Sequence, residues 1–171
     1  MRILYGVVGE GMGHATRSCV ILRHLVERHD VQIVVSGRAH AFLKQTFPQL
    51  EVHEIAGLAM VYEDNEVRRR RTALDFVKKL PGFAENFEIM TRLSQGFRPE
   101  LVVSDFESFA YLYAKKHDLP VVSIDNMQII NRCALDVEIP PEEQASWQMA
   151  KTIVKSKLPH CDYYLITTFF F

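Results

Sequence analysis

The stretch Gly9-Glu10-Gly11-Met12-Gly13-His14 lies between a short apolar run, Arg2–Val8, and a segment of helical periodicity, Ala15–Arg28. The apolar run predicts a β-strand, and the periodic segment predicts a helix with one buried face. Three glycines allow a tight turn and a close approach of the backbone to a ligand, and the free N–H groups of a helix start favour an anion such as a phosphate. A tight turn with positive φ angles is the alternative, and it would account for one or two of the glycines. The stretch therefore indicates a strand, a ligand-binding turn and a helix in succession.

The rest of the chain continues this alternation of strands and helices. Further strands are predicted at Val31–Ser36, Glu51–Ile55, Glu100–Ser104, Pro120–Ile124 and Asp162–Thr167. Further helices are predicted at Ala39–Phe47, Thr72–Gln95 (with a break near Pro81-Gly82), Phe106–His117 and Pro141–Leu158. Most of these strands are near-continuous apolar runs, which is typical of a parallel sheet covered by helices on both faces. The sequence therefore predicts an α/β fold, a Rossmann-like doubly wound domain that binds ligands at the carboxyl ends of its strands.

The composition is that of an ordinary globular protein. Of the 171 residues, 48% are hydrophobic and 24% are charged, and the formal net charge is -1. These values exclude an intrinsically disordered chain and argue against a partner nucleic acid bound through bulk positive charge. The sequence has no apolar run long enough to span a membrane. It also has no CxxC or HExxH motif, so it predicts no metal site. Three scattered cysteines and the absence of a signal-peptide pattern lead us to expect a cytoplasmic protein.

Two common nucleotide-binding motifs do not match the Gly-rich stretch. The NAD motif G-x-G-x-x-G would need a glycine where this chain has His14, and Ser36-Gly37 stands where an acid would bind the ribose. A Walker A loop is excluded because no Gly-Lys-Ser/Thr occurs. The residues Gly11–Arg17 instead resemble the first loop of the amino-terminal domain of GT-B glycosyltransferases that act from UDP-sugars. That group contains MurG, the monogalactosyldiacylglycerol synthases and the UDP-glucuronosyl/glucosyltransferases.

This resemblance covers the whole chain as an order of strands and helices, including Pro99–Asp105. It implies two similar domains that face each other across a cleft, the first holding the acceptor and the second binding most of the nucleotide-sugar. It also implies sugar transfer to a hydroxyl with inversion, no metal cofactor and a nucleotide-sugar, UDP-linked, as co-substrate. Because the chain stops at Phe169–Phe171, we expect residues 1–171 to be the acceptor-side domain alone, inactive without a carboxyl-terminal donor domain. MurG has a proline where this chain has Arg17, so the resemblance does not identify the acceptor class. We expect the acceptor to be a small molecule or a lipid-linked group.

His14 and Asp105 are the candidate catalytic residues. Glycosyl transfer needs a base for the acceptor proton, and imidazole exchanges protons near neutral pH. Asp105 follows the fourth predicted strand, which neighbours the first in a doubly wound sheet, and an aspartate in the matching place orients the histidine in the plant-type enzymes. We therefore expect an imidazole nitrogen about 2.6–3.2 Å from the Asp105 carboxylate. The alternatives are a capping or buried histidine and an N-cap at Asp105 for the next helix. Glu107 is a weaker substitute for Asp105, and Glu10 is a fallback base.

Five residues are candidates for substrate binding: Gly11, Gly13, Arg17, Asp125 and Asn126. Arg17 lies one helical turn after His14, where it could meet a phosphate or an anionic acceptor, or it could be an exposed surface arginine. Asp125 and Asn126 follow the fifth strand and could bind sugar hydroxyls, or they could form an Asx turn.

The predicted loop Gly57–Arg71 carries an acidic patch and then the basic run Arg68–Arg71. One interpretation is a mobile loop that meets an anionic lipid surface or lipid-phosphate acceptor, which would give a peripheral contact at the inner face of the membrane. The alternative is a solvated loop.

Two other functions stay open at this point. A nucleotide-sugar hydrolase or 2-epimerase shares the fold, and a hydrolase would use His14 to activate water. A binding module that has lost its chemistry would lack a contact between His14 and Asp105.

Overall fold

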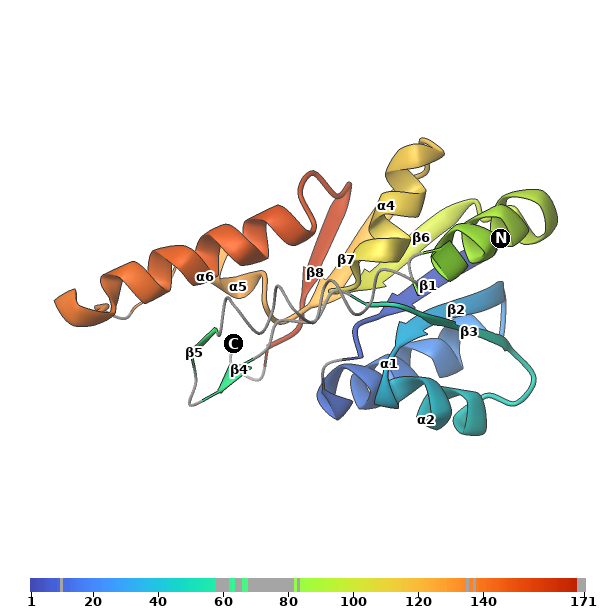
Figure 1. Ribbon diagram of the computed structural model, residues 1–171, viewed down its shortest axis with the longest axis horizontal. Coiled ribbons are helices and arrows are strands. Elements are labelled where there is room, and N and C mark those ends of the chain that lie inside the picture. The colour runs from blue at the N-terminus through green and yellow to red at the C-terminus, as the bar shows by residue number, and fades with distance from the viewer. Residues whose placement is uncertain are drawn as a thin grey trace.

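The computed structural model describes residues 1–9, 11–57, 62–63, 66–67, 82, 84–134, 136 and 138–168. Its centre is a six-stranded sheet in the order β3-β2-β1-β6-β7-β8, in which every neighbouring pair is parallel (Figure 1). The strands are β1 (Arg2–Val7), β2 (Asp30–Ser36), β3 (Glu51–Ile55), β6 (Leu101–Asp105), β7 (Val121–Asp125) and β8 (Tyr163–Ile166). The order and the parallel direction confirm the predicted Rossmann-like doubly wound domain.

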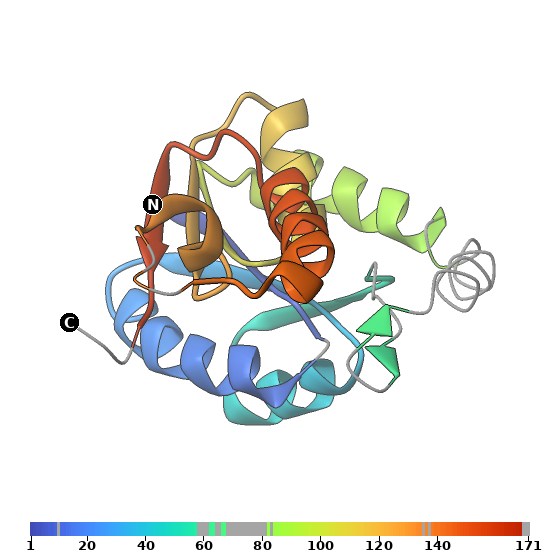
Figure 2. The same ribbon diagram turned by 90° about the vertical axis from the view of Figure 1, so that its left-hand side faces the viewer.

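Helices cover both faces of this sheet (Figure 2). One face carries α1 (Met12–Leu25) and α2 (Arg38–Thr46). The other carries a helix over residues 84–92, which runs into the π-helical turn η1 (Leu93–Phe97), together with α4 (Ser108–Lys116) and α6 (Gln144–Lys157). Two short elements precede α6: α5 (Ile129–Arg132) and the 3-10 turn η2 (Pro141–Glu143).

Alternation along β1 separates two hydrophobic cores. Successive side chains of a strand point to opposite faces. Accordingly, Ile3 and Tyr5 belong to the core beneath α1 and α2, whereas Leu4 belongs to the core beneath α4 and α6. All three side chains are buried. Because both faces of the central strands are covered, these strands read in the sequence as continuous apolar runs.

Several details differ from the sequence prediction. Helix α1 begins at Met12 rather than Ala15, so Gly13 and His14 lie in its first turn. Helix α4 begins at Ser108 rather than Phe106, because Phe106 adopts a left-handed backbone with φ 55°. The predicted loop Gly57–Arg71 contains a small antiparallel hairpin, β4 (Tyr62–Glu63) and β5 (Glu66–Val67), which the sequence prediction missed along with α5.

Several predicted features lie outside the described residues. They are the basic run Arg68–Arg71, the part of the predicted helix before residue 84 other than residue 82, the fallback base Glu10 and the aromatic end Phe169–Phe171. Among the helices that are described, none is both long and apolar enough to cross a membrane.

Candidate active site at the carboxyl ends of the strands

The candidate site lies where β1 and β6 end side by side. Val7 pairs with Asp105 in the parallel register, and the backbone N–H of Val8 donates to the Asp105 carbonyl at 3.1 Å. The chain leaving β1 turns at once into α1, which starts beside this edge of the sheet. The first turn of α1 and the last residue of β6 therefore meet, as the doubly wound order predicts.

His14 and Asp105 are in direct contact. Nδ1 of His14 lies 2.7 Å from Oδ1 of Asp105, which confirms the predicted distance. The Asp105 side chain is fully buried, whereas the His14 side chain retains 19% of its exposure. Ser18, one turn further along α1, donates to Oδ2 of Asp105 at 2.8 Å. The hydrogen-bond contacts of the His14 ring with the described residues all involve Nδ1, and none involves Nε2.

Arg17 joins the same carboxylate from α1. Its Nη2 donates to Oδ1 of Asp105, and its Nε donates to Oδ2 at 3.2 Å. Its Nη1 donates to Oδ1 of Asn126 at 3.3 Å and to Oγ1 of Thr167 at 3.2 Å. The side chain is only 22% exposed, so the alternative of an exposed surface arginine is wrong. A buried carboxylate needs a paired charge, and Arg17 provides it.

Phe106 forms one wall beside the imidazole. Its ring stacks against His14 with centroids 6.3 Å apart and an angle of 14° between the planes. Nζ of Lys157, from α6, lies 4.2 Å above the Phe106 ring. The left-handed backbone of Phe106 turns the chain sharply after β6, and this turn carries the ring to His14 while the next residue begins the cap of α4.

Glu107, not Asp105, caps α4. Its carboxylate accepts from the backbone N–H groups of Phe109 at 2.9 Å and Ala110 at 2.7 Å. Burial raises the pKa of Glu107, and the two backbone hydrogen bonds oppose that shift. The N-cap alternative for Asp105 is therefore wrong. Glu107 also does not substitute for Asp105, because its carboxylate accepts hydrogen bonds from the first turn of α4.

The glycines of the loop have different structural reasons. A Cβ at Gly9 would lie 1.6 Å from the carbonyl oxygen of Ser36, so the close packing of these two segments requires a glycine. A Cβ at Gly11 or Gly13 would meet no atom within 4 Å. Of the described glycines only Gly37 has a positive φ, so the positive-φ alternative does not explain this loop. The missing side chains at Gly11 and Gly13 leave open space next to His14.

Comparisons with known proteins identify the family of this chain. The family model described as glycosyl transferase family 1 matches residues 1–171. The chain belongs to this family. No match was found among curated protein sequences.

Solved structures similar to this family 1 chain share its fold. MurG of Acinetobacter baumannii aligns at 13% identity with a TM-score of 0.54, over 98% of this chain and 45% of MurG. Phytolacca americana UGT2, solved with UDP-2fluoro-glucose and pterostilbene, aligns at 12% identity with a TM-score of 0.59, over 98% of this chain and 48% of UGT2. The spinosyn rhamnosyltransferase SpnG aligns at 18% identity with a TM-score of 0.55, over 97% and 45% of the two chains. This chain thus spans about half the length of these relatives and has the fold of one half of a GT-B enzyme.

Asp125 and Asn126 have separate roles in the family 1 domain. The buried Asp125 carboxylate accepts from Oγ of Ser123 at 2.6 Å and from the backbone N–H of Gln128 at 2.9 Å. Asp125 thus holds the turn that follows β7 through the N–H three residues on, whereas the predicted Asx turn would use the N–H two residues on. Asn126 is exposed and accepts from Arg17. Binding of sugar hydroxyls by these two residues, and of any ligand by Gly11, Gly13 or Arg17, stays a prediction.

Sequence reasoning missed Ser18 and Thr167. Ser18 follows His14 by one helical turn, so the shared helix face was a usable signal. Thr167 follows the last described strand, and only its place at the carboxyl edge could have indicated it. In the part of the chain described by the structure, no group of three or more histidine, cysteine or acidic residues is arranged to hold a metal ion.

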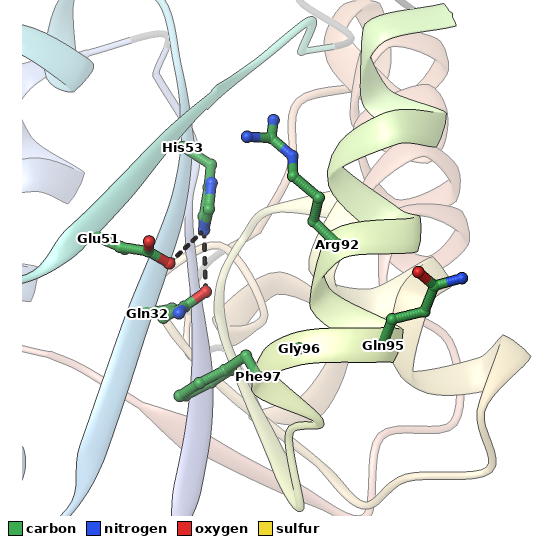
Figure 3. A pocket seen from close by; sticks show the side chains of 7 residues that line it. All are labelled: Gln32, Glu51, His53, Arg92, Gln95, Gly96 and Phe97. Carbon is green, nitrogen blue, oxygen red and sulfur yellow. Dashed lines mark hydrogen bonds and ion pairs between the residues drawn. The ribbon is translucent and has the colours of Figure 1, made fainter.

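A separate pocket of about 600 Å³ lies between β2 and β3 on one side and the helical segment that ends in η1 on the other (Figure 3). It is lined by Gln32, Glu51, His53, Arg92, Gln95, Gly96 and Phe97. Nε2 of His53 lies 2.9 Å from Oε1 of Gln32 and 3.7 Å from Oε2 of Glu51. Burial lowers the pKa of His53, and the Glu51 carboxylate opposes this shift.

Proposed function

We propose that this chain forms the acceptor-side domain, residues 1–171, of an inverting glycosyltransferase that takes its sugar from a nucleotide-sugar. His14 is the general base, and Asp105 orients it. The observation that carries this proposal is the 2.7 Å contact between Nδ1 of His14 and Oδ1 of Asp105, with no hydrogen bond to Nε2 from any described residue. A binding module without chemistry would not need this contact.

The reaction follows from the geometry of the pair. With its Nδ1–H bonded to Asp105, His14 carries a lone pair on Nε2, and this lone pair accepts the proton of the acceptor hydroxyl. The hydroxyl oxygen forms a bond to the anomeric carbon on the face opposite the nucleotide. The bond between that carbon and the diphosphate breaks, and the nucleotide leaves with the bonding electrons. Attack from the opposite face inverts the configuration, and the Asp105 carboxylate stabilises the imidazolium that forms.

The donor, on this proposal, is a UDP-linked sugar bound mainly by a second domain, and the step requires no metal ion. The solved relatives are about twice as long as this chain, which supports a second domain. The isolated chain should then neither transfer sugar nor bind UDP tightly, which radiolabelled transfer assays and calorimetry can measure. Tight binding of UDP to residues 1–171 would place the donor site here and overturn the domain assignment.

The acceptor is a small molecule or a lipid-linked hydroxyl. Because Arg68–Arg71 is the one dense basic run of the sequence, we propose that it makes a peripheral contact with the inner face of the membrane. Sedimentation with anionic vesicles tests this contact, and binding that persists after all four arginines are replaced by glutamine would refute it.

Substitution of His14 tests the proposed base. In the enzyme with both domains, His14→Ala should lower kcat by about 10²–10⁴-fold, a typical loss for a general base. His24→Ala is the matched control, since His24 is exposed on the same helix and should change little. The rate is measured as release of UDP from a panel of UDP-sugars, with and without lipid and small-molecule acceptors. Release that is independent of every acceptor would instead indicate hydrolysis, and an unchanged rate in His14→Ala would remove the base from this residue.

A further inference from the structure

Arg17 has every donor of its guanidinium directed at another side chain. The group carries five N–H donors in a planar fork. Nε and Nη2 each donate to one oxygen of Asp105, and Nη1 donates to Asn126 and Thr167. The remaining Nη2 proton lies on the side of His14, whose Nδ1 is 2.9 Å from Nη2. Four of the five donors therefore have an acceptor in the protein, and the fifth faces the ring of His14.

The charge of Arg17 matters because Asp105 is fully buried. An isolated buried carboxylate is unfavourable, and it would be neutralised unless a cation paired with it. Arginine is always charged in proteins, so it pairs with Asp105 whatever the protonation state of His14. The carboxylate therefore stays an acceptor throughout the proposed catalytic cycle.

The geometry also favours one tautomer of His14. Oδ1 of Asp105 receives both Nη2 of Arg17 and Nδ1 of His14. If Nη2 donated to an unprotonated Nδ1 instead, the proton of the imidazole would sit on Nε2, and no lone pair would face a ligand. With Arg17 bonded to both oxygens of Asp105, the ionised Oδ1 is the acceptor for Nδ1–H, and Nε2 keeps its lone pair.

The outer end of the guanidinium fixes its position. Asn126 follows β7 and Thr167 follows β8, so these two contacts join Arg17 to strands other than β6. Arg17 and His14 are three residues apart in α1 and therefore share one face of that helix. Rotation of the guanidinium away from Asp105 would break these two contacts as well.

From these contacts we propose that Arg17 is a positioning residue, which holds Asp105 ionised and aligned so that His14 adopts the Nδ1–H tautomer with a free Nε2. This inference rests on the proposed function for its role in catalysis, whereas the tautomer itself can be measured without turnover.

The tautomer is read from long-range ¹H–¹⁵N spectra of the ¹⁵N-histidine-labelled chain, at a pH where His14 is neutral. In the wild-type chain His14 should show a protonated Nδ1 and an unprotonated Nε2. Arg17→Met should give a mixture of both tautomers, and Arg17→Lys should retain part of the preference. Arg23→Met is the matched control, because Arg23 is exposed on the same helix, and it should match the wild type. A wild-type Nε2–H tautomer overturns the proposal, and so does an Arg17→Met chain with a native backbone spectrum and an unchanged tautomer. The wild-type spectrum decides the point even if Arg17→Met fails to fold.

Kinetics of the enzyme with both domains separate positioning from substrate binding. Arg17→Lys should lower kcat by about 10- to 100-fold, the loss seen in metal enzymes when a residue that orients a metal ligand is replaced. The KM of either substrate should change little. A raised KM with an unchanged kcat would mean that Arg17 binds substrate, and it would overturn the positioning role. Failure of the proposed function would appear separately, as an enzyme without transferase activity whose His14 still shows the Nδ1–H tautomer.

Discussion

Replacement of Gly13 by alanine should make the protein more stable and less active. Gly13 is the second residue of α1, its φ is not positive, and a Cβ built on it meets no atom within 4 Å. Neither the backbone conformation nor the packing of the described residues therefore requires a glycine. We therefore predict that the glycine matters for a ligand, because it leaves open space in the first turn of α1, one residue before His14.

The gain in stability follows from helix propensity. Alanine is favoured over glycine within a helix by about 0.5–1 kcal/mol, mainly because glycine loses more backbone entropy on folding. For a domain of this size, 1 kcal/mol shifts Tm by roughly 2–4 °C, so Gly13→Ala should raise Tm by about 1–4 °C. Position in the first turn places the gain towards the lower end, because fewer helical hydrogen bonds depend on this residue.

Two measurements on Gly13→Ala test the reasoning. Thermal unfolding gives the change in Tm, and turnover by the enzyme with both domains gives the functional cost. Gly96→Ala is the control, since Gly96 also has open space at Cβ and no positive φ but lies in η1, away from His14. A fall in Tm would refute the account of the backbone. A higher Tm with unchanged turnover and KM would refute the idea that Gly13 leaves room for substrate.

Three further predictions concern the fold. Gly9→Ala should destabilise the protein by about 3 kcal/mol or more in urea unfolding, because the added methyl would overlap the carbonyl oxygen of Ser36. A loss below about 1 kcal/mol would mean that the segments around Gly9 and Ser36 move apart easily. Glu107→Ala should lower the free energy of unfolding by about 1–3 kcal/mol in the same assay, since two buried N–H groups of α4 lose their acceptor. Amide hydrogen exchange should become faster first at the start of that helix. Burial lowers the pKa of His53 in the folded state below its unfolded value of about 6.5, so folding excludes a proton there and stability should fall as pH drops below that value. His53→Gln should flatten this dependence between about pH 7 and pH 5, and an equally steep loss in the variant would assign the dependence to other groups.

Much of the fold could be read from the sequence because its signals are local. Strands such as β1 and β6 are short apolar runs, and glycine or proline ends most of the periodic segments between them. The contact between His14 and Asp105 could also be predicted, since it needs only the strand order of a doubly wound sheet and the position of each residue after its strand.

Local sequence signals do not decide which of Asp105 and Glu107 caps α4. Asp105 ends β6 and Glu107 comes two residues later, and both types of acid could cap a helix. Which one does so depends on Phe106, whose left-handed backbone delays the start of α4 and directs Glu107 to the helix and Asp105 to His14. A phenylalanine in this conformation is uncommon, so no sequence rule would have placed the turn there.

The contacts of Arg17 were beyond sequence reasoning for a different reason. Its partners Asn126 and Thr167 are 109 and 150 residues away in the chain. Their approach depends on how far each strand runs before it ends, which is the least reliable part of any sequence prediction.

The contact between Arg17 and Thr167 has a consequence for the order of folding. It closes one of the longest loops in the molecule, and contacts of such long range form late because the chain entropy must be lost first. β8 lies at the edge of the sheet and leaves Tyr163 and Leu165 more than half exposed, features of a strand that opens locally before the rest of a domain. A newly synthesised chain would therefore form the contacts of His14 and Arg17 with Asp105 first, and the contact of Arg17 with Thr167 only when β8 docks. Each transient opening of that edge strand would break the contact with Thr167, while Asp105 and Asn126 still hold the guanidinium.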